Sequence, residues 1–309
     1  MFMFRGPLYC IVLFMLLSLN ACTDQQAGTR IDESKEKGMQ AMPERQLASG
    51  FGDYWYANKA ELTSYKLEQA RYGEIHEGQA VLVYVTEPFD LRQQVKENDP
   101  EPEDPNVLKL NRYKHFYTGV YPYTIMTSSF LPVKDGGHAR KITNSIQEWC
   151  GQVFMQLNNR DKYHIKQFSY FQSEGDTTYL MEEKPWLEDE LWNLLRLKPE
   201  ELPTGQFTAV PAFSYLRMSH QEVMPYTAQA EIEKGQEGVH TYELLYPALR
   251  RYLKIHYRAD FPHTIEGWKE SYYSGFGKEE KKLTTTAELH KRIRTDYWNK
   301  NGVEDSVWR

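Results

Sequence analysis

Residues 283–297 read LTTTAELHKRIRTDY, and their side chains alternate between two classes. Mostly apolar positions share one parity and polar positions take the other, which is the period of two that a half-buried β-strand shows. Lys291 is the only charged residue on the apolar side. Ala, Glu and Lys also favour helices, so a helix is the alternative, but the alternation favours a strand. The apolar set is Leu283, Thr285, Ala287, Leu289, Ile293 and Tyr297.

Similar strand signals recur along the chain and are separated by turn residues. Residues 80–86 are apolar and β-branched on both faces, as expected of a buried strand. Almost every connection is too short for a crossover helix, so we expect an antiparallel sheet. The sequence therefore predicts a mainly β fold, a curled antiparallel sheet or barrel of about ten strands. The other predicted strands are 62–72 (joined to 80–86 through 73–78), 121–133, 141–157, 163–171, 205–219 and 222–233.

One helix is predicted between Pro185 and Pro199. Pro185 suits a first helical turn and Pro199 closes the segment. Its leucines fall on one face, and three consecutive acids lie near the positive end of the helix dipole. A single helix packed against a curled sheet is the architecture of lipid-carrier lipoproteins, which serve here as an analogy. The leucines are Leu187, Leu191, Leu194 and Leu195, and the acids are Glu188, Asp189 and Glu190.

The beginning of the chain has the layout of a secretory signal. Arg5 precedes an apolar run that ends in small residues near position 21. The run has about 12 residues, whereas a membrane-spanning helix needs about 20. Residues 1–21 are therefore predicted to be a signal peptide. The formal net charge of the 309-residue chain is −6, which argues against a general nucleic-acid-binding protein.

Leu19-Asn20-Ala21-Cys22 resembles the lipobox of bacterial lipoproteins. The resemblance implies that the Cys22 thiol receives diacylglycerol, that cleavage occurs just before it, and that acyl chains such as palmitate anchor the protein. The alternative is a plain signal peptide cut near a cysteine. Thr23 follows Cys22 where an aspartate would favour the inner membrane, so the enteric sorting rule implies the outer membrane, with the body of the protein in the periplasm.

A tether is expected to follow the lipidated cysteine. Residues 23–50 contain no aromatic side chain and are rich in Gln, Glu, Lys, Ser and Gly, so they cannot bury enough apolar surface to fold alone. Aromatic residues then arrive abruptly from Phe51. We therefore expect residues 22–50 to be the lipidated cysteine with its flexible tether, and 51–309 to be a single, mostly antiparallel β domain.

No motif in the sequence identifies a reaction. The chain lacks Gly-x-Ser-x-Gly, a P-loop, His-Glu-x-x-His and Cys-x-x-Cys, so no cofactor or metal site is predicted and a catalytic residue stays unknown. Cys150, next to Gly151, is expected to be a small, buried and inert residue. The acidic segment 97–106 is expected to be a solvated loop. Four histidines are expected to lie singly on strands: His164, His220, His240 and His256.

Aromatic residues are plentiful, with 22 tyrosines and 7 tryptophans. Such rings stack on sugars and gather at interfaces because they combine area with a polar tip. They could form an exposed platform or line a lipid-binding cavity, although β-sheets also favour tyrosine for its own sake. The weak ligand-binding candidates are Tyr117, Tyr121, Tyr123, Tyr272 and Tyr273.

Residues 54–61, 80–87, 145–158 and 297–301 together carry a family resemblance. They resemble a group of envelope lipoproteins from Gram-negative bacteria that often carries the label "septum formation inhibitor Maf". The resemblance covers most of residues 51–301 and implies an envelope protein without a catalytic motif. Maf nucleotide pyrophosphatases have Leu-Ala-Ser followed by Pro-Arg-Arg, whereas Leu47-Ala48-Ser49 is followed here by Gly50-Phe51-Gly52.

The sequence therefore favours a membrane-anchored, extracytoplasmic and non-enzymatic lipoprotein. Its expected partners are the membrane, through the acyl chains on Cys22, and an apolar ligand, a glycan or an envelope protein. An extracytoplasmic hydrolase of envelope glycans or peptides is the first alternative, because acid pairs distant in sequence can meet in a fold. A Maf-type nucleotide pyrophosphatase is the second alternative.

Overall fold

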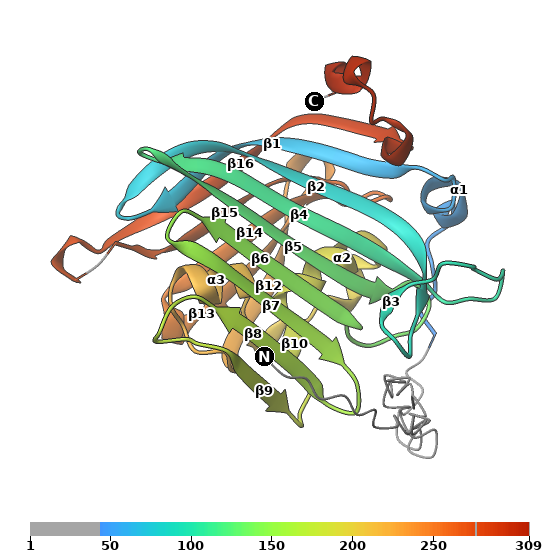
Figure 1. Cartoon of the computed structure of the whole chain (residues 1–309). Coiled ribbons are helices and arrows are strands. Elements are labelled where there is room, and N and C mark those ends of the chain that lie inside the picture. The colour runs from blue at the N-terminus through green and yellow to red at the C-terminus, as the bar shows by residue number, and fades with distance from the viewer. Residues whose placement is uncertain (1–43, 276, 309) are drawn as a thin grey trace, which may run out of the picture. The chain divides into compact units, whose positions relative to one another are not determined.

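The computed structural model describes residues 44–275 and 277–308. The predicted signal peptide, Cys22 and residues 23–43 of the predicted tether lie outside the described residues. The described part is mainly β, with a large antiparallel sheet and few helices, as predicted (Figure 1).

The described helices are α1 (Phe51–Trp55), α2 (Glu188–Leu197) and α3 (Phe213–Met218). Short 3-10 turns are η2 (Pro199–Glu201), η3 (Gln236–Gly238), η4 (Pro247–Leu249), η5 (Gly277–Glu279), η6 (Tyr297–Asn299) and η7 (Val303–Trp308). The strands are β1 (Ala60–Arg71), β2 (Glu74–Asp90), β3 (Val95–Lys96), β4 (Asn106–Thr118), β5 (Tyr121–Pro132), β6 (Lys141–Glu148), β7 (Gly151–Asn159), β8 (Tyr163–Ser169), β9 (Thr177–Met181), β10 (Trp186–Leu187), β11 (Gly205–Val210), β12 (Tyr226–Lys234), β13 (Val239–Tyr246), β14 (Arg251–Arg258), β15 (Ile265–Ser274) and β16 (Lys281–Thr295).

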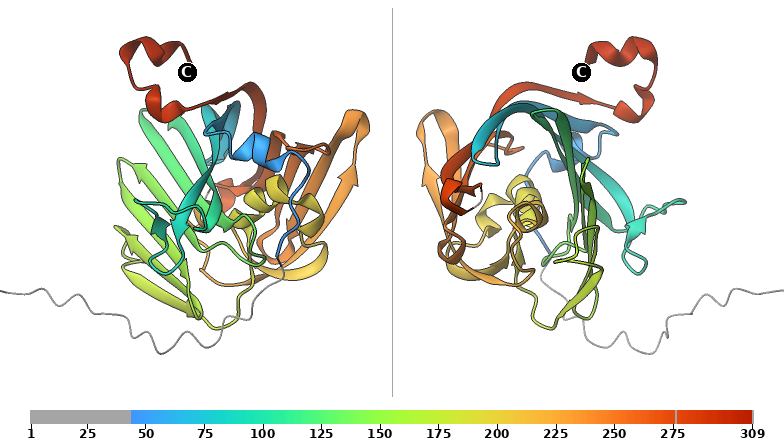
Figure 2. Two further views of the ribbon diagram at one scale, coloured as in Figure 1. Left: turned by 90° about the vertical axis from the view of Figure 1, so that its right-hand side faces the viewer. Right: turned by 60° about the vertical axis from the view of Figure 1, so that its left-hand side comes forward.

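The strands of the described residues form one 16-stranded sheet. Its order is β10-β11-β12-β13-β14-β15-β16-β1-β2-β4-β5-β6-β7-β8-β9, and β3 pairs with β2. Neighbours are antiparallel except β10 and β11, which are parallel. The sheet curls around α2, which lies on its concave side (Figure 2). The fold class is thus as predicted.

The strand count exceeds the predicted ten for identifiable reasons. Predicted strand 141–157 is two strands, β6 and β7, joined by a turn at Trp149 and Cys150. Seven other strands lie outside the predicted strand segments: β3, β4, β9, β10, β13, β14 and β15. Two of these place a buried arginine on the concave face, Arg112 in β4 and Arg251 in β14. A charged residue at an inward position breaks the alternation by which strands are recognised.

A β-bulge in β16 explains why Lys291 interrupts the apolar side. Tyr65 of β1 pairs with Leu289, but its neighbour Ser64 pairs with Lys291, so His290 has no partner in the register. An unpaired residue moves the following side chains to the other face of the sheet. The predicted strand is confirmed, whereas the single apolar face ends at Leu289, and Ile293 lies with Leu62 on the convex side.

The predicted helix is confirmed as α2, but its surroundings differ from a surface helix. All ten of its residues are buried, including the three acids of its first turn. Pro185 precedes the helix rather than opening it, because β10 and the N-cap Leu187 come first. The Glu190 carboxylate accepts a hydrogen bond of 3.0 Å from the Leu187 backbone N–H, which closes the first turn.

Three other predictions are wrong. Predicted strand 205–219 is the strand β11 followed by the helix α3. His220 lies in a turn after α3 with a φ of 49°, not on a strand. Cys150 is exposed in the β6–β7 turn instead of buried, because the chain reverses at Trp149 and the thiol faces solvent.

Packing of the chain begins before Phe51. Arg45 is 4% exposed, and its guanidinium donates hydrogen bonds of 2.7 and 3.1 Å to the carbonyls of Pro132 and Val133. Glu44 forms an isolated bridge with Asp135. Glu44 and Arg45 of the predicted tether therefore attach the chain to the β5–β6 connection.

Candidate functional site

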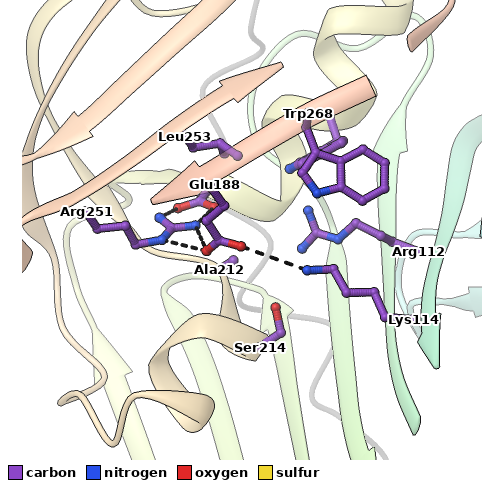
Figure 3. A pocket seen from close by; sticks show the side chains of 10 residues that line it. Arg112, Lys114, Glu188, Ala212, Ser214, Arg251, Leu253 and Trp268 are labelled. Carbon is purple, nitrogen blue, oxygen red and sulfur yellow. Dashed lines mark hydrogen bonds and ion pairs between the residues drawn. The ribbon is translucent and has the colours of Figure 1, made fainter. Parts of the chain in front are cut away.

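The concave side of the sheet holds a cluster of charged side chains around the first turn of α2 (Figure 3). Arg251 of β14 donates two hydrogen bonds of 2.6 Å to the Glu188 carboxylate and one of 2.8 Å to Glu270 of β15. Arg112 of β4 binds Asp189 at 2.5 Å. These pairs fix α2 to strands from both halves of the sheet.

Lys114 of β4 is the least tightly bound member of the cluster. Its Nζ lies 3.9 Å from a Glu270 oxygen and 3.4 Å from the Gln69 side-chain oxygen. Burial lowers the pKa of Lys114, and Glu270 opposes that effect. Burial alone would raise the pKa of Glu270, yet Arg251 and Lys114 hold it below its ordinary value.

The cavities inside the cluster are very small. One of about 10 Å³ lies among Arg112, Glu188 and Trp268, and one of about 20 Å³ lies beside Lys114 and Tyr272. A single water needs roughly 10–15 Å³, so each space suits one water and neither holds a ligand in this conformation. Glu188 and Glu270 both bind Arg251, so this pair is not arranged as a free acid and a free base.

The rest of α2 is fixed by similar contacts. Arg196 makes two hydrogen bonds of 2.7 Å with Glu61 of β1, and Tyr54 donates a third hydrogen bond to that carboxylate. Near the other end, His138 lies 2.7 Å from Glu190, whose second oxygen accepts the Ala139 N–H at 2.5 Å. The acidic residues of α2, which the sequence placed only at a helix dipole, are thus buried ion-pair partners.

A second cluster, the aromatic rim, lies where β1–β2, β4–β5 and β6–β7 turn at one end of the sheet. The Tyr72 and Tyr123 hydroxyls are 2.6 Å apart, and Tyr121 donates to Tyr72 at 3.3 Å. Arg71 lies 4.3 Å above the Tyr72 ring, and Trp149 stacks on Tyr121 with 6.1 Å between centroids. Burial would raise the pKa of Tyr72, but the hydrogen bonds from Tyr121 and Tyr123 and the charge of Arg71 lower it.

The five aromatic candidates from the sequence are distributed between the surface and the core. Tyr121 and Tyr123 meet in the aromatic rim, whereas Tyr117 is exposed on the convex side and its ring contacts His115 edge-on. Tyr123 and Tyr272 are buried, so neither ring belongs to an exposed platform. Tyr273 lies under the Arg250 guanidinium at 3.7 Å.

The number of acidic side chains on the convex surface differs sharply between two parts of the sheet. Strands β4 to β9, which are consecutive neighbours, contain one acidic residue, Glu148, although the chain has 43 acids among 309 residues. The convex side of β1, β2 and β16 instead has a hollow of about 320 Å³ lined by three acids, Glu68, Glu77 and Glu288. We call the outward side chains of β4 to β9 the acid-free face.

An apolar row crosses the acid-free face at right angles to the strands. The residues are direct cross-strand partners in successive strands, so their side chains lie side by side. Met126, Phe154 and Phe168 are 42%, 39% and 47% exposed. With Ser145 as the one polar member, the row consists of Tyr113, Met126, Ser145, Phe154 and Phe168.

Two further hollows lie outside the acid-free face. One of about 420 Å³ adjoins the predicted acidic loop and is lined by Glu103, Asp104 and Lys134 among others. One of about 390 Å³ lies on β11 to β14 beside Gln229 and Tyr252. Among the described residues, no group of three or more His, Cys, Asp or Glu side chains has the geometry of a metal site. No helix in that part of the chain is both long and apolar enough to cross a membrane.

No family model matches the chain, and no curated protein matches it. Among solved structures, the chain is similar to the crystal structure of a β-barrel-like protein of the domain of unknown function DUF1849 from Brucella abortus. The TM-score is 0.42 and the sequence identity is 8%, over 76% of this chain and 96% of that chain.

Proposed function

We propose that the chain is a non-enzymatic lipoprotein of the bacterial envelope, anchored to the outer membrane through Cys22, that binds a glycan or an envelope partner on its outer surface. The lipobox and the resemblance to envelope lipoproteins support the anchor and the location. The observation that carries the binding role is the contrast between a filled interior and exposed rings. The two cavities in the buried charged cluster are about 10 and 20 Å³, while Trp149, Phe154 and Phe168 are 71%, 39% and 47% exposed.

An apolar ligand inside the sheet is less well supported than surface binding. A lipid chain would have to displace α2 and leave Glu188, Asp189 and Arg196 without their partners, and unpaired buried charges are strongly unfavourable. In the buried charged cluster, Glu188 and Glu270 are both held by Arg251, so this pair does not support the alternative of a hydrolase. Surface binding leaves α2 and its buried ion pairs in place.

The anchor is tested by labelling cells with radioactive palmitate and comparing the natural chain with the Cys22→Ser variant. We expect label and membrane fractionation for the natural chain and neither for the variant. A Cys10→Ser variant is the control and should incorporate label normally. Label that persists in Cys22→Ser would exclude Cys22 as the acylated residue.

The binding role is tested with the full-length protein in intact cells. Crosslinking in intact cells, followed by identification of attached glycans and proteins by mass spectrometry, should recover a defined ligand at the outer surface. A Trp149→Ala variant should reduce the yield if the aromatic rim contributes. Turnover of envelope glycans or peptides by the purified protein would instead support the hydrolase.

A further inference from the structure

The acid-free face has the composition of a surface that accepts a polar chain. Amide and hydroxyl side chains flank the apolar row on both sides and can both donate and accept hydrogen bonds. On the outward side of β4 to β9 these residues are Asn111, Thr124, Ser128, Thr143, Gln147, Gln152, Gln156, Asn158 and Thr178.

Several of these polar groups are held in place by their neighbours. Gln156 donates to Asn158 at 2.7 Å, and Asn158 in turn donates to Gln94 at 2.8 Å. Ser128 donates to Asn111 at 2.7 Å. Groups that are already ordered lose little conformational freedom when a ligand binds, which favours affinity.

The dimensions of the row suit an elongated ligand. It runs from β4 to β8, which is four strand spacings or roughly 19 Å. Met126, Phe154 and Phe168 provide apolar surface along it, and ring faces pack against the C–H faces of sugars. A chain laid across the strands would therefore meet apolar surface at its centre and hydrogen-bonding groups along both margins.

The charge of this face indicates which ligands it tolerates. Its outward charged residues are Lys109, Lys141 and Lys166, whereas the chain as a whole has a net charge of −6. Lys109 is paired with Glu87 at 3.3 Å, and Lys166 is exposed. A face without carboxylates accepts anionic groups that would be repelled by the acidic hollow on β1, β2 and β16.

We propose that the acid-free face binds a polysaccharide chain across β4 to β8, with the apolar row against the sugar rings and the flanking amides bound to their hydroxyl groups. The inference rests on the proposed binding function and assigns it a site and a ligand class. A lipid bilayer fits less well, because pressing this face into hydrocarbon would bury exposed amides such as Gln147 and Gln152 away from water.

The test measures binding of the full-length protein in nonionic detergent to two immobilised probes, laminarin as a neutral polysaccharide and polygalacturonate as an acidic one. The double variant Phe154→Thr, Phe168→Thr removes two members of the row while keeping β-formers. Removal of two such contacts should weaken binding by about tenfold. Ile75→Thr, at a 43% exposed position on β2, is the matched control and should bind normally.

A charge variant tests whether the lack of carboxylates on this face favours binding of an acidic polysaccharide. Gln156→Glu should weaken binding to polygalacturonate more than binding to laminarin, and the difference should shrink at high salt. Gln229→Glu places the same charge on β12, outside the acid-free face, and should leave both affinities unchanged. Circular dichroism of each variant verifies that the β fold is retained.

The outcomes separate this inference from the proposed function. If the natural protein binds polysaccharide and the row variant binds equally well, the site assignment is wrong and the general binding role stands. If it binds neither probe, the polysaccharide assignment is wrong, and the crosslinking experiment alone decides the general role. A last experiment measures acetylation of lysines by acetic anhydride in protein bound to lipid vesicles, without polysaccharide. If Lys166 on the acid-free face is protected and Lys66 on β1 is not, the face lies against the bilayer and the inference is overturned.

Discussion

Glu188 of α2 and Arg251 of β14 bind each other through two hydrogen bonds of 2.6 Å, and each side chain is 1% exposed. Charges so deeply buried lose their hydration and are stable only together. Replacing Arg251 with Met should lower the free energy of unfolding by about 3–5 kcal/mol, because Glu188 would lose its principal partner.

A second variant identifies the source of that loss. The double change Glu188→Gln, Arg251→Met removes both charges, so it should cost less than Arg251→Met alone. Urea unfolding followed by tryptophan fluorescence measures the double variant and the two single variants, Arg251→Met and Glu188→Gln. If the double variant is as unstable as the sum of the two single variants, the side chains contribute independently and the pairing is not the cause.

The pair His138–Glu190 should make stability depend on pH. Burial alone would lower the pKa of His138, but the Glu190 carboxylate at 2.7 Å raises it above its ordinary value. A folded-state pKa above that of the unfolded chain contributes stability fully below the unfolded pKa, and the contribution is lost as pH rises through the folded pKa. His138→Gln should therefore destabilise the protein more at pH 5.5 than at pH 9.

Urea unfolding of the natural protein and His138→Gln at several pH values measures this difference. Burial is the main cause that lowers the pKa values of His256 and His263. Both histidines are present in both proteins, so their contribution to the pH dependence of stability largely cancels. If the difference in unfolding free energy between the two proteins does not change with pH, the His138–Glu190 pair is not a source of pH-dependent stability.

The strands were predictable where alternation is undisturbed and not where charges point inward. The period of two in segment 283–297 predicts a strand, but no local pattern predicts the bulge at His290, because the bulge depends on pairing with Ser64 and Tyr65 of distant β1. Arg112 hides β4 because its inward charge breaks the alternation, and Arg251 does the same at the start of β14, where the sequence predicts only that His256 lies on a strand. Their inward positions become intelligible only once Asp189 and Glu188 lie opposite them.

The candidate sites were less predictable than the fold. The sequence offers Tyr121 and Tyr123 as ligand-binding candidates, and both lie in the aromatic rim, but their neighbours there, Arg71 and Tyr72, come from another hairpin. The apolar row depends on the register of five strands and no local pattern encodes it. The scarcity of acids between residues 106 and 134 and again between 136 and 147 was the one signal in the sequence that could have indicated the acid-free face.

Cys150 should be a slow but accessible thiol. A hydrogen bond with the Glu148 carboxylate and the charge of that group raise the pKa of Cys150, so less thiolate is present near pH 8. The folded protein should react completely with Ellman's reagent, and Glu148→Gln should react faster at pH 8. Gln147→Asn, one position away, is the control. A thiol that reacts only after unfolding would contradict its exposed position.

Arg45 should stabilise the whole folded part, because it joins the beginning of the described chain to the β5–β6 connection. Its guanidinium satisfies the carbonyls of Pro132, Val133 and Asp135 at 2.7, 3.1 and 3.3 Å. Arg45→Met keeps much of the apolar stem but leaves these buried acceptors unpaired, which should cost about 1–3 kcal/mol in urea unfolding.

Lys59→Met, at an exposed position before β1, is the control and should change stability by less than about 0.5 kcal/mol. Equal stability of the two variants would mean that the contacts of Arg45 contribute little to the fold.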